Sequence, residues 1–325
     1  MIVGCLALMA GCRPVGGVDR DPHVLAANAE MPEEVTVPLL RDRRYFRAPV
    51  EINGVDVGTF LVDTGAALMA ADLGVVRRLE LEANGGGTAI GIAGRERFAY
   101  YDMDSLAVGE MTLSKRRVAG LNMRSLHRHR RSRLDGILGY TTLAEVPFTI
   151  DGPARELVFH RRESFSVPEG LQPIRLIRFR HLPTVEAELG DGRRIWLVLD
   201  TGADEMLSLP IELASRWPDI LSTSVTAPSM NRGVGGVVIG RKAWVTSLAV
   251  FGKRFVDVQA TFAAPPESFR SAPVPVGRIG NAFLKRFRLT FDNQAGRMWA
   301  ELDREMVQST GDRGRTQPVG ASGSR

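Results

Sequence analysis

Two identical acidic motifs are the residues of this sequence best suited to chemistry. Residues 63–66 and residues 200–203 both read Asp-Thr-Gly-Ala, and each follows a strand-like apolar run. One such motif alone is weak evidence, because an Asp in a turn often accepts hydrogen bonds from backbone N–H groups. Two carboxylates at hydrogen-bond distance cannot both ionise, however, so they share one proton. Such a pair can hold a water molecule, with one carboxylate as general base and the other as general acid toward a carbonyl.

The sequence around the two motifs repeats in the same order. A turn precedes each motif, Asn53-Gly54 in the first copy and Gly190-Asp191-Gly192 in the second, and such turns favour hairpins because they accept positive φ. Downstream, the copies share glycine-rich hairpin tips at 91–94 and 233–236, apolar-turn-apolar stretches at 106–113 and 248–255, Gly-x-x-Gly segments at 136–139 and 277–280, and Thr-x-Asp endings at 149–151 and 290–292. We infer an internal duplication whose two lobes are related by an approximate two-fold axis, which would bring Asp63 and Asp200 together.

The residues that follow each Asp fit this arrangement. Gly65 and Gly202 would let the backbone turn sharply beside the acid. Thr64 and Thr201 carry hydroxyls that can bond the opposite lobe and hold the two loops together. These four residues are therefore expected to support the carboxylate pair.

The glycine-rich tips have two open interpretations. Gly91, Ile92 and Gly94 in the first copy, and Gly233 and Gly235 in the second, are candidates for mobile flaps that close over a bound peptide and exclude water. They are equally well explained as plain hairpin turns.

The paired motifs, each followed by an apolar-Gly segment, resemble the aspartic peptidases, especially the bacterial retropepsin-like members. The resemblance covers most of residues 36–305. It implies an all-β, bilobal acid-protease fold with two homologous β-barrel-like lobes and a peptide-binding cleft between them. It also implies Asp63 and Asp200 as the catalytic dyad of an aspartic endopeptidase that acts on a peptide or protein, with no cofactor. The alternative is a catalytically inactive peptide-binding or structural envelope lipoprotein with the same fold. Because both lobes occur in one chain, we expect a monomer.

One departure from the pepsin-like pattern bears on the working pH. Ala66 and Ala203 stand where pepsin-like enzymes usually carry Ser or Thr, whose hydroxyl bonds the catalytic carboxylate. Loss of a donor to the charged form raises the pKa of a carboxyl group. We therefore expect activity at less acidic pH than in pepsin-like enzymes.

Two charged residues distinguish the second copy. Asp204 and Arg278 stand at positions where the first copy has the apolar Ala67 and Ile137. The joint change predicts a salt bridge between Asp204 and Arg278 near the cleft, because an unpartnered charge there would be costly. The competing interpretation is that Arg278 lines a substrate pocket and selects acidic side chains.

The ends of the chain predict export. Residues 1–12 are read as a signal peptide whose last residues, Leu-Met-Ala-Gly-Cys, resemble a bacterial lipoprotein signal in which Cys12 is lipidated; an ordinary cleaved signal is the alternative. Residues 13–35 then form a tether, 36–165 the N-terminal lobe, 166–305 the C-terminal lobe and 306–325 a disordered tail. The expected location is the bacterial periplasm, with a possible membrane tether through Cys12.

Composition and motif content give no support to nucleic-acid binding or metal binding. With 44% hydrophobic and 24% charged residues, and with 34 glycines and 18 prolines, the 325-residue chain has the make-up of a turn-rich globular protein. Much of the net charge of +5 lies in the arginine-rich run 127–133, which lacks interleaved aromatic residues and is read as a solvated loop, so no nucleic-acid partner is expected. No cysteine follows Cys12 and no His-Glu-x-x-His motif occurs, so no metal site is expected.

Overall fold

The computed structural model describes residues 2–3, 29–40, 44–91, 94–123, 134–222, 228–233, 236–270, 272–303 and 316–317. Cys12, Ile92, Gly235 and the arginine-rich run 127–133 lie outside these residues. The described chain is all-β and bilobal, with three sheets and four helices of at most six residues. The helices are α1 (Leu73–Arg78), α3 (Tyr140–Leu143), α4 (Glu212–Arg216) and α5 (Asn281–Leu284). None of the helices in these residues is long and apolar enough to span a membrane.

The first lobe is an eight-stranded sheet in the order β2-β9-β6-β10-β5-β4-β8-β7. An additional pairing between β8 and β9 closes six of these strands into a ring. The strands are β2 (Ala29–Glu30), β4 (Arg47–Ile52), β5 (Val55–Asp63), β6 (Ala70–Asp72), β7 (Ala83–Gly91), β8 (Gly94–Val108), β9 (Met111–Leu121) and β10 (Gly136–Gly139).

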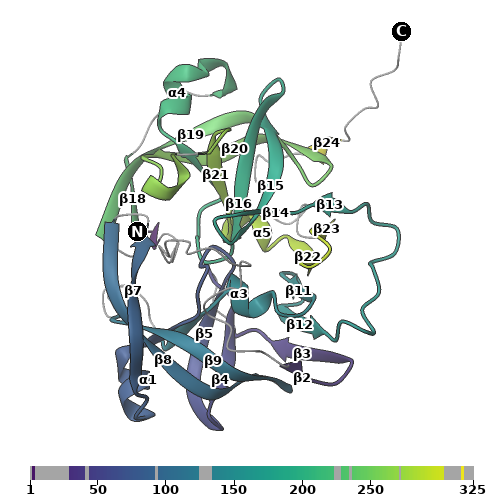
Figure 1. Cartoon of the computed structure of the whole chain (residues 1–325). Helices are drawn as coiled ribbons and strands as arrows, with labels where there is room; N and C mark the ends of the chain where they lie inside the picture. Colours follow the sequence, from purple (N-terminus) through teal and green to yellow (C-terminus); the bar gives the residue numbers. More distant parts are fainter. Residues whose placement is uncertain are drawn as a thin grey trace.

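The second lobe repeats this order of pairing. Its path is β1-β18-β19-β15-β16-β21-β17-β20-β24, and a pairing between β19 and β20 again closes a ring of six strands. The strands on this path are β1 (Ile2–Val3), β15 (Leu182–Leu189), β16 (Arg193–Asp200), β17 (Leu207–Pro210), β18 (Pro228–Gly233), β19 (Gly236–Val250), β20 (Lys253–Ala263), β21 (Val276–Gly280) and β24 (Thr316–Gln317), and β14 (Ile177–Phe179) pairs with β15. The two lobes are stacked one above the other in Figure 1, with the purple-to-blue first lobe below the green second lobe.

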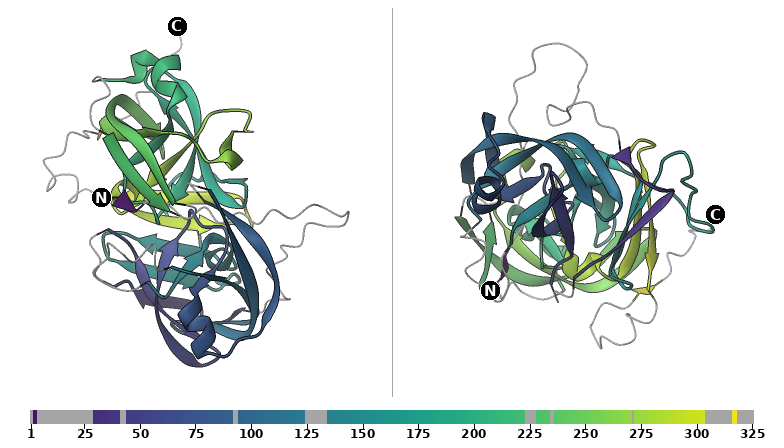
Figure 2. Two further views of the ribbon diagram at one scale, coloured as in Figure 1. Left: turned by 90° about the vertical axis from the view of Figure 1, so that its left-hand side faces the viewer. Right: turned by 90° about the horizontal axis from the view of Figure 1, so that it is seen from below.

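A third sheet joins the lobes. Its order is β13-β23-β22-β11-β12-β3, so three strands from the second half of the chain lie beside three strands from the first half, and β22 and β11 meet in the middle. The strands are β3 (Glu34–Pro38), β11 (Phe148–Asp151), β12 (Glu156–His160), β13 (Ile174–Arg175), β22 (Phe287–Asp292) and β23 (Arg297–Leu302). Phe148 of β11 stacks on Phe291 of β22 with ring centroids 4.6 Å apart. The first view in Figure 2 shows this sheet beside the junction of the two lobes.

Turn chemistry explains the hairpins that lead to both acidic motifs. Asn53 and Gly54 both adopt positive φ between β4 and β5, whose ends pair Ile52 with Val55. Gly190 and Gly192 adopt positive φ between β15 and β16. Both hairpins predicted from these residues are therefore confirmed.

Some paired strands lie outside the predicted bounds of the two lobes. Strand β2 and the first residues of β3 fall within the predicted tether 13–35, because Ala29 and Glu30 pair with β9 and Glu34 pairs with His160. In the predicted disordered tail, Thr316 and Gln317 pair with β20. Backbone groups at the edges of existing strands accept the short additions β2 and β24, whereas β3 also buries Val35 and Val37 in alternation. Strand β1, in the predicted signal peptide, pairs with β18.

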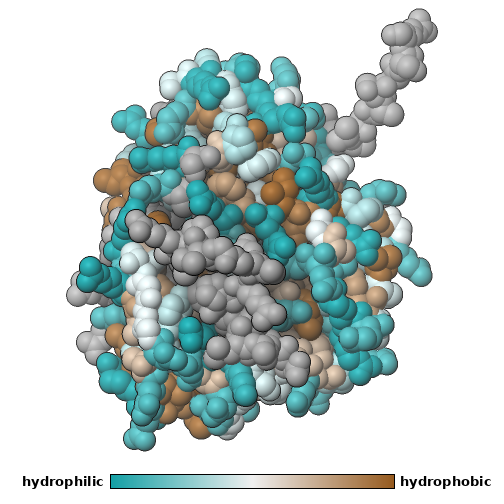
Figure 3. All heavy atoms as spheres, in the orientation of Figure 1, coloured by the Kyte–Doolittle hydropathy of each residue, from teal (hydrophilic) through white to brown (hydrophobic). Residues whose placement is uncertain are grey.

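The surface over both lobes is mostly polar on one side of the molecule. On the face shown in Figure 3, hydrophobic residues occur in small scattered groups among hydrophilic ones.

Candidate active site

The two acidic motifs lie at equivalent strand ends. Asp63 is the last residue of β5 and Asp200 the last residue of β16. Each of these strands pairs in parallel with a Gly-x-x-Gly strand, so that Asp63 lies opposite Gly139 and Asp200 opposite Gly280. Neither Asp side chain has any exposed surface. The buried strands thus fix both carboxylates in the interior.

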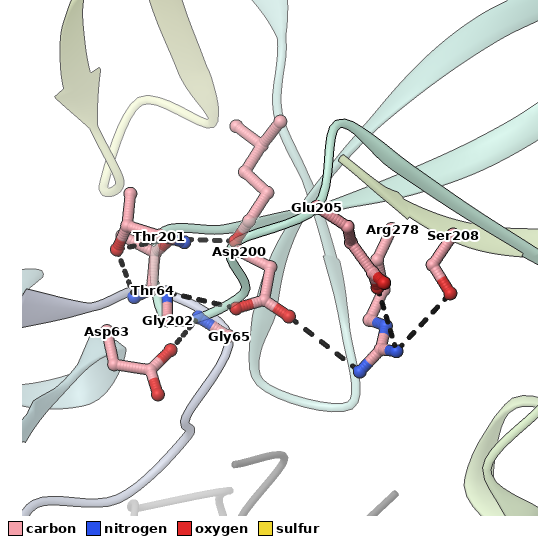
Figure 4. Close-up of polar contacts among 10 residues, drawn as sticks. Asp63, Thr64, Gly65, Asp200, Thr201, Gly202, Glu205, Ser208 and Arg278 are labelled. Atoms are coloured by element: carbon pink, nitrogen blue, oxygen red, sulfur yellow. Dashed lines mark hydrogen bonds and ion pairs between the residues drawn. The ribbon is translucent and has the colours of Figure 1, made fainter. Parts of the chain in front are cut away.

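Each carboxylate packs against the glycine of the opposite motif. A Cβ atom added at Gly65 would come within 3.0 Å of the carboxylate of Asp200, and a Cβ added at Gly202 would come equally close to the carboxylate of Asp63. The two carboxylates therefore lie together at the junction of the lobes (Figure 4). The N–H of Gly65 also donates to Oδ1 of Asp63 at 2.9 Å, and the N–H of Gly202 donates to Oδ1 of Asp200 at 3.1 Å.

Thr64 and Thr201 join the two loops by a reciprocal set of hydrogen bonds. The N–H of Thr64 donates to Oγ1 of Thr201 at 3.0 Å, and the N–H of Thr201 donates to Oγ1 of Thr64 at 3.1 Å. Each hydroxyl in turn donates to a carbonyl of the opposite lobe at 2.7 Å, that of Leu199 or Val62. All of these bonds are buried, so water does not compete for them.

Comparison with known proteins finds a match within the first lobe. A model of the aspartyl protease family matches residues 48–142, which extend from β4 into α3 and include Asp63. Over these residues of the first lobe, the chain is similar to the aspartyl protease family. No curated protein matches the chain.

The salt bridge predicted between Asp204 and Arg278 is wrong. Asp204 instead pairs with Arg44 of the first lobe, with 2.9 Å between Oδ2 and Nη1. Arg278 has Glu205 at 3.5 Å from its Nη2 atom and Asp200 at 3.9 Å from its Nη1 atom. The physical reason is that neighbouring side chains of the turn after Asp200 project in different directions, and only that of Glu205 reaches β21.

The sequence contains a signal for Glu205. Glu205 stands five residues after Asp200, and Leu68 stands five residues after Asp63, so this position also changes from apolar to acidic. The hydroxyl of Ser208 completes the surroundings of Arg278, 3.4 Å from its Nη2 atom. Glu205, Ser208 and Arg278 appear together beside Asp200 in Figure 4.

Burial affects the ionisation of the cross-lobe pair. It raises the pKa of Asp204, and the charge and hydrogen bond of Arg44 oppose that rise. The Asp204 side chain is 6% exposed whereas that of Arg44 is 58% exposed, so the acid bears most of the desolvation cost.

Arg278 also borders a small pocket in the second lobe. This cavity has a volume of about 20 Å³, and Leu209, Phe269 and Val276 contribute to its walls. Since two acidic side chains already flank the guanidinium, its charge is largely compensated on the protein side. Selection of acidic substrate side chains by Arg278 stays a prediction.

The predicted glycine-rich tips are the ends of hairpins. Gly91 pairs with Gly94 and Gly233 pairs with Gly236, which leaves two residues for each turn. One residue past the first tip, Arg95 forms an ion pair with Glu267 of the second lobe at 2.8 Å, a contact that the sequence did not suggest. The first hairpin is thus connected to the opposite lobe, while its movement as a flap stays a prediction.

Apolar side chains from both lobes surround the acidic motifs. Leu68 and Phe98 from the first lobe belong to one buried cluster with Val198, Phe269 and Val276 from the second. In such surroundings electrostatic interactions are stronger than in water. Within the described residues, no group of three or more histidine, cysteine or carboxylate side chains is placed to hold a metal ion.

Proposed function

We propose that this protein is an aspartic endopeptidase in which Asp63 and Asp200 activate a water molecule. The observation that supports the proposal most strongly is the reciprocal packing of each carboxylate on the glycine of the opposite motif. Two carboxylates held this close in an apolar environment share a proton rather than both ionising. The match to the aspartyl protease family over residues 48–142 supports the same reaction class.

The proposed reaction needs one ionised and one protonated carboxyl group. The ionised group removes a proton from water as the hydroxyl oxygen bonds to the scissile carbonyl carbon, and the protonated group gives its proton to the carbonyl oxygen. In the resulting gem-diol the C–N bond then breaks. The leaving nitrogen receives the proton that came from water, and a gem-diol hydroxyl returns a proton to the other carboxylate. The dyad ends with one proton, as it began.

Access of a peptide requires movement above the dyad. Asp63 and Asp200 are fully buried, so a substrate must displace the side chains or hairpins that cover them. The first hairpin, whose residue Arg95 bonds Glu267 across the junction, is the element that we propose to move.

The test of this function is cleavage of a diverse peptide library by the purified chain between pH 3 and 7.5. We expect wild-type cleavage to be lost in Asp63→Asn and in Asp200→Asn. Asp219→Asn, at an exposed Asp paired with Arg193, is the matched control and should keep full activity. If the folded wild-type protein cleaves nothing but binds peptides, the inactive peptide-binding alternative replaces the proposal.

We also propose that the protein is exported to the bacterial periplasm and tethered through a lipid on Cys12. The support is the small-residue motif that ends at Cys12. In a bacterial host, the wild-type chain should fractionate with membranes and Cys12→Ser should not. Equal fractionation of both chains would exclude lipidation at Cys12.

A further inference from the structure

The two halves of the site differ in charge although their backbones correspond. Arg278 lies opposite Val198 and Ser208 in the second lobe, and in the same registers of the first lobe Ile137 lies opposite Leu61 and Ala70. The position of Glu205 is likewise taken by an apolar residue, Leu68, in the first lobe. A cationic side chain with an acidic partner thus adjoins Asp200, while the corresponding positions beside Asp63 carry no charge.

The position of Arg278 makes this difference effective. Its side chain is 7% exposed, and the Nη1 atom lies 3.9 Å from Oδ2 of the fully buried Asp200. A second nitrogen, Nη2, faces Glu205 and Ser208 (Figure 4), so contacts on that side hold the guanidinium in place. A positive charge within 4–6 Å favours the ionised form of a carboxyl group, and the effect grows where water is excluded.

We propose that Arg278, held by Glu205, determines the protonation of the dyad, so that Asp200 is the ionised carboxylate and Asp63 carries the shared proton. Ala66 offers Asp63 no hydroxyl, so the last residue of the first motif does not reproduce the effect of Arg278 on Asp200. Ala203 offers none to Asp200 either, but there Arg278 stands in for the donor.

On the proposed function, this assigns the two steps of proton transfer. Asp200 takes the proton from water and later gives it to the leaving nitrogen, while Asp63 gives its proton to the carbonyl oxygen and recovers one from the gem-diol. Arg278 is thus a positioning residue that acts through Asp200 and does not need to touch the substrate.

Other charged groups face this part of the dyad and must be counted. Asp63 lies across from Asp200, and Glu205 opposes part of the charge of Arg278. Beyond Glu205, a cavity of about 250 Å³ is also lined by Arg44, Asp204 and Lys242. The Arg44–Asp204 pair is internally compensated, so Arg278 is the cation with the shortest recorded distance to Asp200 among these described groups.

The direct test is a carboxyl titration by ¹³C NMR, which requires no catalytic activity. In Asp63→Asn the remaining Asp200 should ionise at a lower pH than the remaining Asp63 does in Asp200→Asn, by about one pH unit or more. Adding Arg278→Met should move the titration of Asp200 to higher pH by about one unit and leave that of Asp63 nearly unchanged. Equal titration of the two carboxyls, or no response to Arg278→Met, would overturn the proposal.

Two further variants distinguish a specific effect of Arg278 from a general disturbance of the fold. Glu205→Gln removes the acid that competes for Arg278, so Asp200 should ionise at still lower pH. The double variant Glu205→Gln/Arg278→Met leaves neither charge buried alone and should shift Asp200 in the opposite direction. Shifts of the same sign in both would refute the assignment. If these titrations agree but no peptide is cleaved, the charge assignment stands and the peptidase function fails; if cleavage occurs, its acid limb should follow the titration of Asp200.

Discussion

At the scale of single residues, the site depends on atoms that each lobe supplies to the other. The hydroxyl of Thr64 bonds Leu199 and the hydroxyl of Thr201 bonds Val62, so neither loop is complete without its partner. The same dependence applies to the carboxylates. Each occupies the space that a Cβ atom would fill if the glycine of the opposite motif were any other residue. A motif that is weak evidence in isolation therefore acquires its geometry only as a pair.

Removal of one threonine hydroxyl should be costly. Thr64→Ala leaves the buried N–H of Thr201 and the carbonyl of Leu199 without their present partner, and an unmet buried polar group costs about 1–3 kcal/mol. We expect a loss of about 2 kcal/mol in the free energy of unfolding, measured by urea denaturation, together with reduced peptide cleavage. Thr64→Ser retains the hydroxyl and should lose much less. An equal loss in both variants would show that packing of the methyl group, rather than the hydrogen bonds, is responsible.

At the scale of elements, the hairpin of β7 and β8 links the two lobes through its exposed tip. Both side chains of the Arg95–Glu267 pair are more than half exposed, so salt screens their attraction. The hydrogen bond and the charge of Arg95 lower the pKa of Glu267. Because the pair is exposed, it adds little to the stability of the protein. Its effect should appear in the opening of the hairpin.

Loss of this pair should ease substrate entry. On the proposal that this hairpin opens to expose the buried dyad, Arg95→Gln should raise kcat/KM at low salt by about twofold, with the difference from wild type disappearing in high salt. The neighbouring exposed Arg97→Gln is the control and should behave as wild type. A decrease in kcat/KM for Arg95→Gln alone would instead indicate that the closed hairpin binds the substrate.

The sequence predicted elements better than it predicted side-chain partners. Turn residues such as Asn53-Gly54 and the glycines at the hairpin tips specify local backbone geometry, so these hairpins were accessible from sequence. Which of Asp204 and Glu205 reaches Arg278 depends on side-chain direction in a turn, which no periodicity encodes. Ser208 of β17 and Ala70 of β6 occupy the same register, opposite Arg278 and Ile137. The second lobe therefore has one more residue than the first between its Asp-Thr-Gly-Ala motif and this position. The Arg44–Asp204 contact required the lobes to be placed together.

At the scale of the whole molecule, two ion pairs in different parts of the fold contain carboxyl groups whose pKa values are shifted in opposite directions. Burial raises the pKa of Asp204 above its ordinary 3.8, so the folded protein holds this proton more tightly than the unfolded chain. Hydrogen bonds from Arg117 and Asn84 lower the pKa of Asp102, so the folded protein there favours the charged form. Ionisation of Asp204 therefore lowers the stability of the folded protein as pH rises above 3.8. Asp102 instead contributes stability that is lost as pH falls through its lowered pKa.

Two neutral substitutions should separate these effects. Relative to wild type, Asp204→Asn should gain free energy of unfolding as pH rises from 3.5 to 7, because it avoids the charge that burial disfavours. Asp102→Asn should lose it, chiefly over the lower part of that range. Urea denaturation at a series of pH values measures both. A loss in Asp204→Asn that grows with pH would mean that attraction to Arg44 outweighs the desolvation of Asp204.

The joining sheet and the shared core predict that the lobes unfold as one unit. Phe148 stacks on Phe291, the hydroxyls of Thr149 and Thr290 are 2.9 Å apart, and one buried cluster includes residues from both rings of strands. Separation of the lobes would expose these surfaces and break the threonine bonds at the dyad, so an intermediate with only one folded lobe should be poorly populated.

The tryptophans allow this to be measured from one lobe. All four lie in the second half of the chain, the first of them at Trp196, so their fluorescence reports that half. Phe60→Leu, in the first-lobe core, should lower the midpoint of the fluorescence transition much as Phe283→Leu in the second lobe does, each by an amount equivalent to about 1 kcal/mol. If only Phe283→Leu moves the transition, the lobes unfold separately. Then the joining sheet would hold two independently stable lobes, and the dyad would be lost when the less stable lobe unfolds.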